Sequence, residues 1–270
     1  MKTQLRKLFW LTCIMVVSAN CFSQTLFTGT NITFGMNGHP LTSRSYYIIP
    51  ISQQLQMLKN NNIKYYRIDV LTDSLGKVIL KPEILDTLCT AAKAAGIELV
   101  PVFYTKNLKY TDDPQIAYDK GYAMGNGFAK KYKKYITYYE LANETDIPLK
   151  TAQIGTSKAA FRAHDSQVVT TYLKGLNDGI KAAYSGAKTI IDFTKFNYGY
   201  LSFFKDANVN FDIVASHWYN SSGYKESEYS SVIKGIKSIY PNKKIWITEF
   251  NHAEGSFKKD PVHQRQWIVD

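Results

Sequence analysis

The sequence has few cysteines, few glycines and prolines, and no long apolar stretch. Three cysteines in 270 residues are too few for a disulfide-stapled fold. The counts of 16 glycines and 8 prolines exclude collagen, and the lack of apolar runs of about 20 residues excludes a polytopic membrane protein. What remains is a chain that is 45% hydrophobic and 14% aromatic, which favours a packed core over disorder.

Residues 1–23 are predicted to be a signal peptide rather than part of the fold. Three basic residues open this segment, and the apolar stretch 8–19 is too short to span a membrane comfortably. Small residues before Gln24 favour cleavage there, which predicts a secreted or periplasmic protein with no membrane span. An uncleaved anchor helix and a surface lipoprotein attached through Cys21 are the less favoured alternatives.

Cleavage before Gln24 leaves Cys89 as the single cysteine, so the mature chain must be stable through core burial alone. Cys89 lies at helical spacing from Leu85 and Leu88, which predicts a buried apolar residue rather than a nucleophile. No linker rich in proline, glycine or serine divides residues 24–270. We therefore expect one domain and a monomer.

The formal net charge of +11 raises the question of a nucleic-acid partner. Much of the positive charge lies just before predicted strands, at Lys64, 130–134, Lys188 and 243–244. In a (β/α) barrel these positions belong to the amino-terminal face, which is remote from the active site. The sequence therefore predicts a solvated basic surface and no nucleic-acid groove.

Helices with apolar residues three and four apart alternate with short strands rich in β-branched and aromatic residues. The predicted helices are 52–62, 82–96, a stretch ending at 135, 168–187, 198–210 and 229–242. The predicted strands are 31–39, 63–70, 97–104, 136–144, 188–194, 211–220 and 243–251. Such alternation predicts a parallel α/β sheet, either open or closed into a barrel. The turn GMNGHPL after the first strand matches neither nucleotide-binding motif, which favours the barrel.

The predicted architecture is a TIM (β/α)8-type barrel that is apparently truncated after the seventh strand. Only DPVHQRQWIVD closes the sequence, and it resembles the start of a helix with no eighth strand after it. The expected domain is thus a barrel over 24–270 with its eighth β/α unit missing and with exposed edges on the first and seventh strands. The long connection 145–164 is expected to cover the site.

In such barrels, the residues that act on substrate lie at the carboxyl ends of the strands. The predicted strand ends carry Arg67, Asp69, Tyr104, Asn143, Glu144, His217, Tyr219, Glu249 and Asn251. Glu144 and Glu249 end the fourth and seventh strands, which face each other across a barrel. Cleavage of a glycosidic bond needs two such carboxyl groups, about 5–5.5 Å apart when one of them is a nucleophile.

These residues carry a resemblance to a known group of enzymes. YYELANETD with Asn143 and Glu144, IWITEFN with Glu249, SHWYN and YYRIDV resemble clan A glycoside hydrolases, and are similar to families 5 and 39. The resemblance covers roughly residues 30 to 255. It implies a retaining (β/α)8 enzyme that cleaves β-glycosidic bonds in an oligo- or polysaccharide.

The resemblance implies that Glu144 is the general acid/base and Glu249 the nucleophile. Arg67 and Tyr219 would stabilise the ionised form of Glu249 by charge and by a hydrogen bond. Asn143 would donate a hydrogen bond to the sugar 2-hydroxyl. Three further residues are predicted to line the sugar subsite, namely His217 and the aromatic side chains of Trp218 and Tyr104.

Other interpretations of these residues stay open at this point. The two glutamates could pair with lysines, Arg67 could form a buried ion pair with Asp69 or Glu140, and the aromatic residues could serve packing alone. A competing function is an inactive or truncated barrel that binds glycans without turnover. A metal-dependent hydrolase is a third, but the five histidines show no HxH, HxxH or HExxH spacing, so neither a metal nor a cofactor is expected.

Overall fold

The computed structural model describes residues 32–104, 106–220 and 226–252. The predicted signal peptide and any unit after residue 252 lie outside the described residues. The chain divides into a short unit, 1–33, and a large unit, 34–270, and the large unit is described here by itself. Within the described residues, no helix is long and apolar enough to cross a membrane.

Within residues 32–252 as described, seven strands form one parallel sheet, and each strand pairs with the next one along the chain. The strands are β1 (Gly35–Gly38), β2 (Tyr65–Val70), β3 (Glu98–Phe103), β4 (Tyr138–Glu140), β5 (Lys188–Ile191), β6 (Ile213–Asn220) and β7 (Lys244–His252). The side-chain amide of Asn37 donates a hydrogen bond of 3.0 Å to the carbonyl of Thr248, which links β1 to β7. The described strands therefore form a nearly closed α/β barrel of the predicted class.

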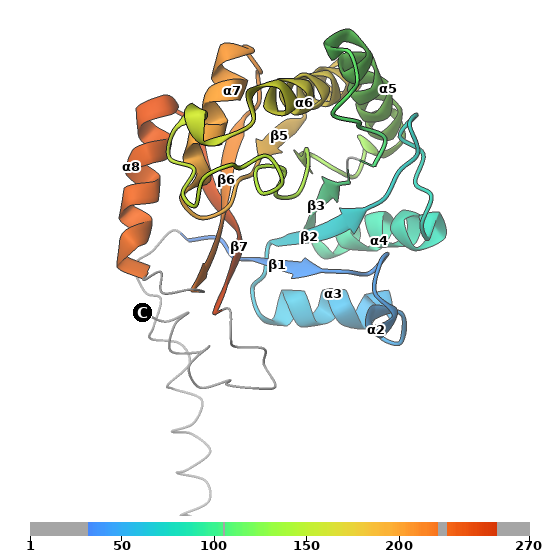
Figure 1. Ribbon diagram of the computed structural model, residues 1–270. Coiled ribbons are helices and arrows are strands. Elements are labelled where there is room, and N and C mark those ends of the chain that lie inside the picture. The colour runs from blue at the N-terminus through green and yellow to red at the C-terminus, as the bar shows by residue number, and fades with distance from the viewer. Residues whose placement is uncertain (1–31, 105, 221–225, 253–270) are drawn as a thin grey trace, which may run out of the picture. The chain divides into compact units, whose positions relative to one another are not determined.

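Helices lie around the outside of these strands (Figure 1). The α-helices are α2 (Arg44–Tyr47), α3 (Ile51–Asn60), α4 (Pro82–Ala95), α5 (Pro114–Tyr132), α6 (Ala163–Ala183), α7 (Leu201–Asp206) and α8 (Tyr229–Ile239). Three short 3₁₀ helices complete the described elements: η1 (Lys158–Ala160), η2 (Asn197–Tyr200) and η3 (Glu226–Glu228). The alternation predicted from the sequence is thus confirmed, but the predicted strands 31–39 and 136–144 are much shorter than expected, at Gly35–Gly38 and Tyr138–Glu140.

The barrel interior is layered because alternate residues of each strand point inward. At the amino ends of the strands, Tyr65, Tyr138 and Trp246 pack together with ring centroids 4.9–5.4 Å apart. Above these rings lies a small apolar cluster made of Val100, Ile190, Ile213 and Ala215. This apolar plug supports a polar layer at the carboxyl ends of the strands.

Two sequence predictions about the outer layers are confirmed. Cys89 is 1% exposed in α4, and burial raises the pKa of its thiol to about 12, so the thiol is not poised for nucleophilic chemistry. Lys64 precedes β2, while Lys188 and Lys244 are the first residues of β5 and β7, which places these charges on the amino-terminal face.

Helices α5 and α6 approach each other closely through glycines. A Cβ atom on Gly175 would lie 2.0 Å from the carbonyl oxygen of Tyr118, and one on Gly121 would lie 2.0 Å from that of Tyr172. Because both obstacles are backbone atoms, a larger residue forces the helices apart.

We therefore expect Gly175→Ala to lower the free energy of unfolding by about 2 kcal/mol, despite the better helix propensity of alanine. Asp119→Ala on the exposed side of α5 should change the free energy by less than about 0.5 kcal/mol. Urea denaturation of both variants tests this, and equal stability would contradict the close contact.

Candidate active site

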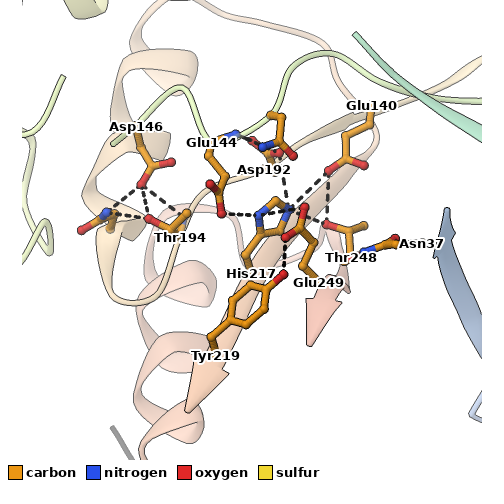
Figure 2. A network of polar contacts seen from close by, with 12 residues as sticks. Asn37, Glu140, Glu144, Asp146, Asp192, Thr194, His217, Tyr219, Thr248 and Glu249 are labelled. Atoms are coloured by element: carbon orange, nitrogen blue, oxygen red, sulfur yellow. Dashed lines mark hydrogen bonds and ion pairs between the residues drawn. The ribbon is translucent and has the colours of Figure 1, made fainter. Parts of the chain in front are cut away.

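The two predicted catalytic glutamates meet at the carboxyl end of the barrel (Figure 2). Glu249 belongs to β7, and Glu144 lies in the loop that follows β4. One carboxylate oxygen of each, together with a ring nitrogen of His217, falls within 4.8 Å of the others. The two carboxyl groups thus lie close together, although they come from different strand units.

Glu249 accepts hydrogen bonds from two donors. The Nη1 of Arg67 donates to its Oε1 at 2.8 Å, and the hydroxyl of Tyr219 donates to its Oε2. Burial and then the bond to Glu249 raise the pKa of Tyr219, so its phenol keeps the proton that it donates. Both contacts hold the Glu249 carboxyl group in place.

Arg67 connects three parts of the site through its guanidinium group. Besides Glu249, it donates to both oxygens of Glu140 and, through Nη2, to the Oδ1 of Asn143 at 2.7 Å. The last contact fixes the orientation of the Asn143 amide by engaging its oxygen. The buried ion pair with Glu140, which the sequence left open, is present, and the same guanidinium also contacts Glu249.

Glu140 is completely buried and ionised. Burial alone opposes its charge, but the Arg67 guanidinium, together with contacts to His217, lowers the pKa of Glu140 to about 2. Its Oε1 also accepts a hydrogen bond of 3.2 Å from the hydroxyl of Thr248. Glu140 is therefore the buried anion that keeps Arg67 in place.

His217 lies at the centre of the network. Its Nδ1 is 2.9 Å from the Oε1 of Glu144, and its Nε2 is 3.1 Å from the Oγ1 of Thr248. Burial alone would lower the pKa of His217, but contacts with Glu140 and Glu144 raise it to about 10. Both ring nitrogens then carry protons at neutral pH. His217 donates to Glu144, and Thr248 passes the next hydrogen bond to Glu140.

Two sequence predictions about substrate contact need correction. His217 is 0% exposed, so its ring acts through Glu144 rather than lining the sugar subsite. Trp218 is also 0% exposed, with its indole packed against Phe196 and Tyr229. The alternation of β6 sends Trp218 outward to the helices while His217 and Tyr219 point inward.

The rim near β1 to β3 carries a second polar group of side chains. Tyr104 follows β3 and is 36% exposed, and burial followed by the charge of Asp69 raises its pKa. Asp69 pairs with His39 and accepts a hydrogen bond of 3.0 Å from Thr42. Tyr104 is therefore a partly exposed side chain on this rim.

The sequence reasoning missed Asp192. This residue directly follows β5, and its carboxylate accepts the backbone N–H of Glu144 at 3.2 and 3.3 Å. An aspartate that ends the apolar run TII is the same kind of signal that identified Glu144 and Glu249. Reading all strand ends would have found it.

Among the residues that the structure describes, two groups of donors have the composition of a metal site, and both share His217. They are Glu140, Asp192 and His217, and Glu144, His217 and Glu249. The carboxylates of Glu140 and Glu249 already hold the cationic Arg67. A histidine that carries two ring protons must lose one before it can bind a metal. The donor set therefore fits a charge and proton network better than a metal centre.

Comparisons with solved structures find the same barrel elsewhere. A GH53 catalytic domain from Ignisphaera aggregans is 17% identical with a TM-score of 0.61, over 84% of this chain and 71% of that one. A β-glucosidase from Thermotoga maritima in complex with cyclophellitol is 10% identical with a TM-score of 0.64, over 90% and 83% of the two chains. These likenesses confirm the fold.

A third similar structure is the virulence factor SghA of Agrobacterium tumefaciens, in complex with its substrate analogue salicin. It is 9% identical with a TM-score of 0.65, over 90% of this chain and 82% of that chain. A comparison with curated protein sequences gives no match. The specific similarity to families 5 and 39 stays a prediction.

The sequence profile of one family matches residues 91–268, which is more than half of the chain. That family is described as the glycosyl hydrolase catalytic core. The matched region includes Glu144, His217 and Glu249, the residues that the barrel brings together. This chain therefore belongs to the glycosyl hydrolase catalytic core family and is a glycoside hydrolase.

Proposed function

We propose that this glycoside hydrolase cleaves β-glycosidic bonds by double displacement, with retention of the anomeric configuration. The spacing of the two carboxyl groups carries the proposal. Oxygens of Glu144 and Glu249 lie within 4.8 Å. Retaining enzymes hold their carboxyl groups about 5–5.5 Å apart, whereas inverting enzymes need about 6.5–9.5 Å to admit a water molecule.

In the first step, a carboxylate oxygen of Glu249 attacks the anomeric carbon, and the bond from that carbon to the leaving oxygen breaks. Glu144 gives its proton to the leaving oxygen, which departs as an alcohol. In the second step, Glu144 takes a proton from water, and the water oxygen displaces Glu249 from the sugar. Arg67 and Tyr219 stabilise the Glu249 carboxylate before attack and when it leaves.

Carbohydrate contacts are proposed for the side chains that border this space. The Asn143 amide nitrogen donates to the 2-hydroxyl, and Tyr104 offers a ring face and a hydroxyl on the rim. The basic and apolar start of the sequence supports export, so an extracellular oligo- or polysaccharide is the proposed substrate. The titles of two similar structures, a β-glucosidase and one bound to salicin, favour a β-glycoside.

Glu144→Ala tests the proposal through its dependence on the leaving group. For phenyl glycosides, which need protonation to depart, we expect kcat/KM to fall by about 10³-fold. For dinitrophenyl glycosides, which leave without a proton, the first step should be nearly unchanged. Added azide should then raise kcat and yield a glycosyl azide, because the small anion needs no general base.

The matched comparison is Glu98→Ala at the amino end of β3, outside the network around Glu249. Glu98→Ala should leave the ratio of the kcat/KM values for phenyl and dinitrophenyl glycosides unchanged. If Glu144→Ala lost equal activity on both classes and gave no azide product, another residue would be the acid/base. If the unaltered protein turned over no aryl β-glycoside or polysaccharide but bound glycans, the binding function considered at first would replace this one.

A further inference from the structure

We propose that Asp192 is a positioning residue for the acid/base, holding the Glu144 carboxyl group over the glycosidic oxygen. The inference rests on the proposed function, because it gives Asp192 a task in the same reaction. Asp192 belongs to a different strand unit from Glu144, so the contact is made by the fold and not by the local sequence.

The backbone conformation of Glu144 requires contacts that stabilise it. Its φ is +52°, in the left-handed region that residues with a side chain seldom adopt. A catalytic glutamate in this conformation needs external contacts that favour it over the ordinary backbone regions. The N–H of Glu144 points at Asp192 and donates to both of its carboxyl oxygens, at 3.2 and 3.3 Å.

Asp192 has no competing hydrogen bond within the described residues. It is 3% exposed, its two hydrogen bonds come from the Glu144 amide, and its Oδ2 also lies 4.0 Å from the Nη2 of Arg67. Its Oδ2 also lies 3.5 Å from the Nε2 of His217, whose Nδ1 holds the Glu144 side chain at 2.9 Å. Asp192 thus reaches Glu144 by two routes, through the backbone and through the imidazole.

A reciprocal contact ties the same two loops together. Asp146, two positions after Glu144, accepts hydrogen bonds from the backbone N–H and hydroxyl of Thr194, at 3.2 and 2.7 Å, and from Asn197 at 2.6 Å. The loop after β5 therefore holds Glu144, and the loop after β4 holds Thr194. Figure 2 shows Glu144 between these two contacts.

The chemistry of Asp192 indicates which replacement should preserve its role. Burial raises the pKa of Asp192 well above its usual range, so a neutral side chain is tolerated there. Asparagine has the same shape and keeps one oxygen that accepts the Glu144 N–H. Alanine removes both the acceptor and the contact with His217.

The test measures kcat/KM for phenyl and dinitrophenyl glycosides in Asp192→Ala and Asp192→Asn. In Asp192→Ala the acid is displaced, so kcat/KM should fall by about 10²-fold for phenyl glycosides. For dinitrophenyl glycosides it should fall by less than about threefold. Asparagine should restore phenyl glycoside activity to within about tenfold of the unaltered protein. If the alanine variant does not fold, Asp192→Ser takes its place, since its short side chain cannot reach both partners.

Asn177→Ala is the matched control. Asn177 is equally buried and holds the same strand through a 2.7 Å bond from Thr189, but it has no contact with Glu144. Asn177→Ala should change kcat/KM by the same factor for phenyl and for dinitrophenyl glycosides. An equal loss on both substrates in the Asp192 variants, or the same leaving-group pattern in Asn177→Ala, would overturn the positioning role. An unaltered protein inactive on every glycoside would overturn the proposed function itself.

Discussion

Replacing Glu249 with glutamine is expected to lower kcat by about 10⁴-fold or more on every substrate, whatever its leaving group. An amide oxygen is too weak a nucleophile to form the bond to the anomeric carbon. The glutamine still accepts hydrogen bonds from Arg67 and Tyr219, so the fold and substrate binding should be preserved. Steady-state kinetics on phenyl and dinitrophenyl glycosides measure the loss.

The same exchange at the opposite end of the barrel provides the control. Glu98→Gln, at the start of β3, should leave kcat within about twofold of the unaltered protein, because surface substitutions outside a site have small effects. The comparison with Glu144→Ala is equally informative, because Glu249→Gln should lower activity on substrates with good and with poor leaving groups alike. Residual activity above about 1% for Glu249→Gln, after correction for deamidation, would contradict its assignment as nucleophile.

The second large effect is expected at Glu140. Its removal leaves the Arg67 guanidinium, whose side chain is 9% exposed, without its buried counter-ion. We expect Glu140→Ala to lower the free energy of unfolding by about 3–5 kcal/mol, as for other broken buried ion pairs. Urea denaturation at pH 7 measures this. Asp86→Ala, which breaks an exposed pair with Lys131, should cost less than about 1 kcal/mol.

The pH dependence of stability gives an independent check on Glu140. Its pKa falls from 4.5 to about 2 on folding, so the ionised group stabilises the folded state above pH 4.5. That contribution is lost as the pH falls toward 2. Glu140→Ala should therefore flatten the acid side of the stability profile. A stability loss that is the same at pH 3 and pH 7 would show that packing, and not charge, explains the variant.

The opposite sign applies to His217. Its pKa rises from 6.5 to about 10 on folding, so the protonated ring stabilises the folded state below pH 6.5, and the contribution is lost as the pH rises through 10. At neutral pH, the buried layer therefore contains Arg67 and His217 as cations and Glu140 as an anion. Glu249 is a second carboxylate that pairs with Arg67.

The barrel and its two central glutamates could be predicted from the sequence because both depend on short-range regularities. Apolar periodicity identifies each strand, and the chemistry of a parallel barrel lies where strands end. Glu144 follows β4 and Glu249 lies in the carboxyl-terminal half of β7, so the order of the strands was enough to predict that they would be near each other. The same rule, applied to β5, points to Asp192.

Trp218 shows a different limit. Its neighbours His217 and Tyr219 both point into the barrel, so a strict period of two already sends the indole outward. Its ring accordingly packs against Phe196 and Tyr229 among the helices. Because the Trp218 ring is buried, it cannot contact a ligand.

The contacts that hold the site are less accessible to sequence reasoning. The left-handed backbone conformation of Glu144 cannot be predicted from the residue type, because glycine is the residue that usually adopts it. The bond from its amide to Asp192 joins residues 48 positions apart. Likewise, the register irregularity between Ser216 and His217, which sets His217 opposite Glu249, is a property of the β6–β7 pairing.

The anomeric configuration of the first product tests the central claim most directly. Proton NMR during the first minutes of hydrolysis of an aryl β-glycoside, before mutarotation, distinguishes the two anomers. Double displacement through Glu249 predicts that the β-anomer appears first and the α-anomer follows as the sugar equilibrates. Initial release of the α-anomer would contradict the account, because inversion requires a water molecule where Glu249 is proposed to attack.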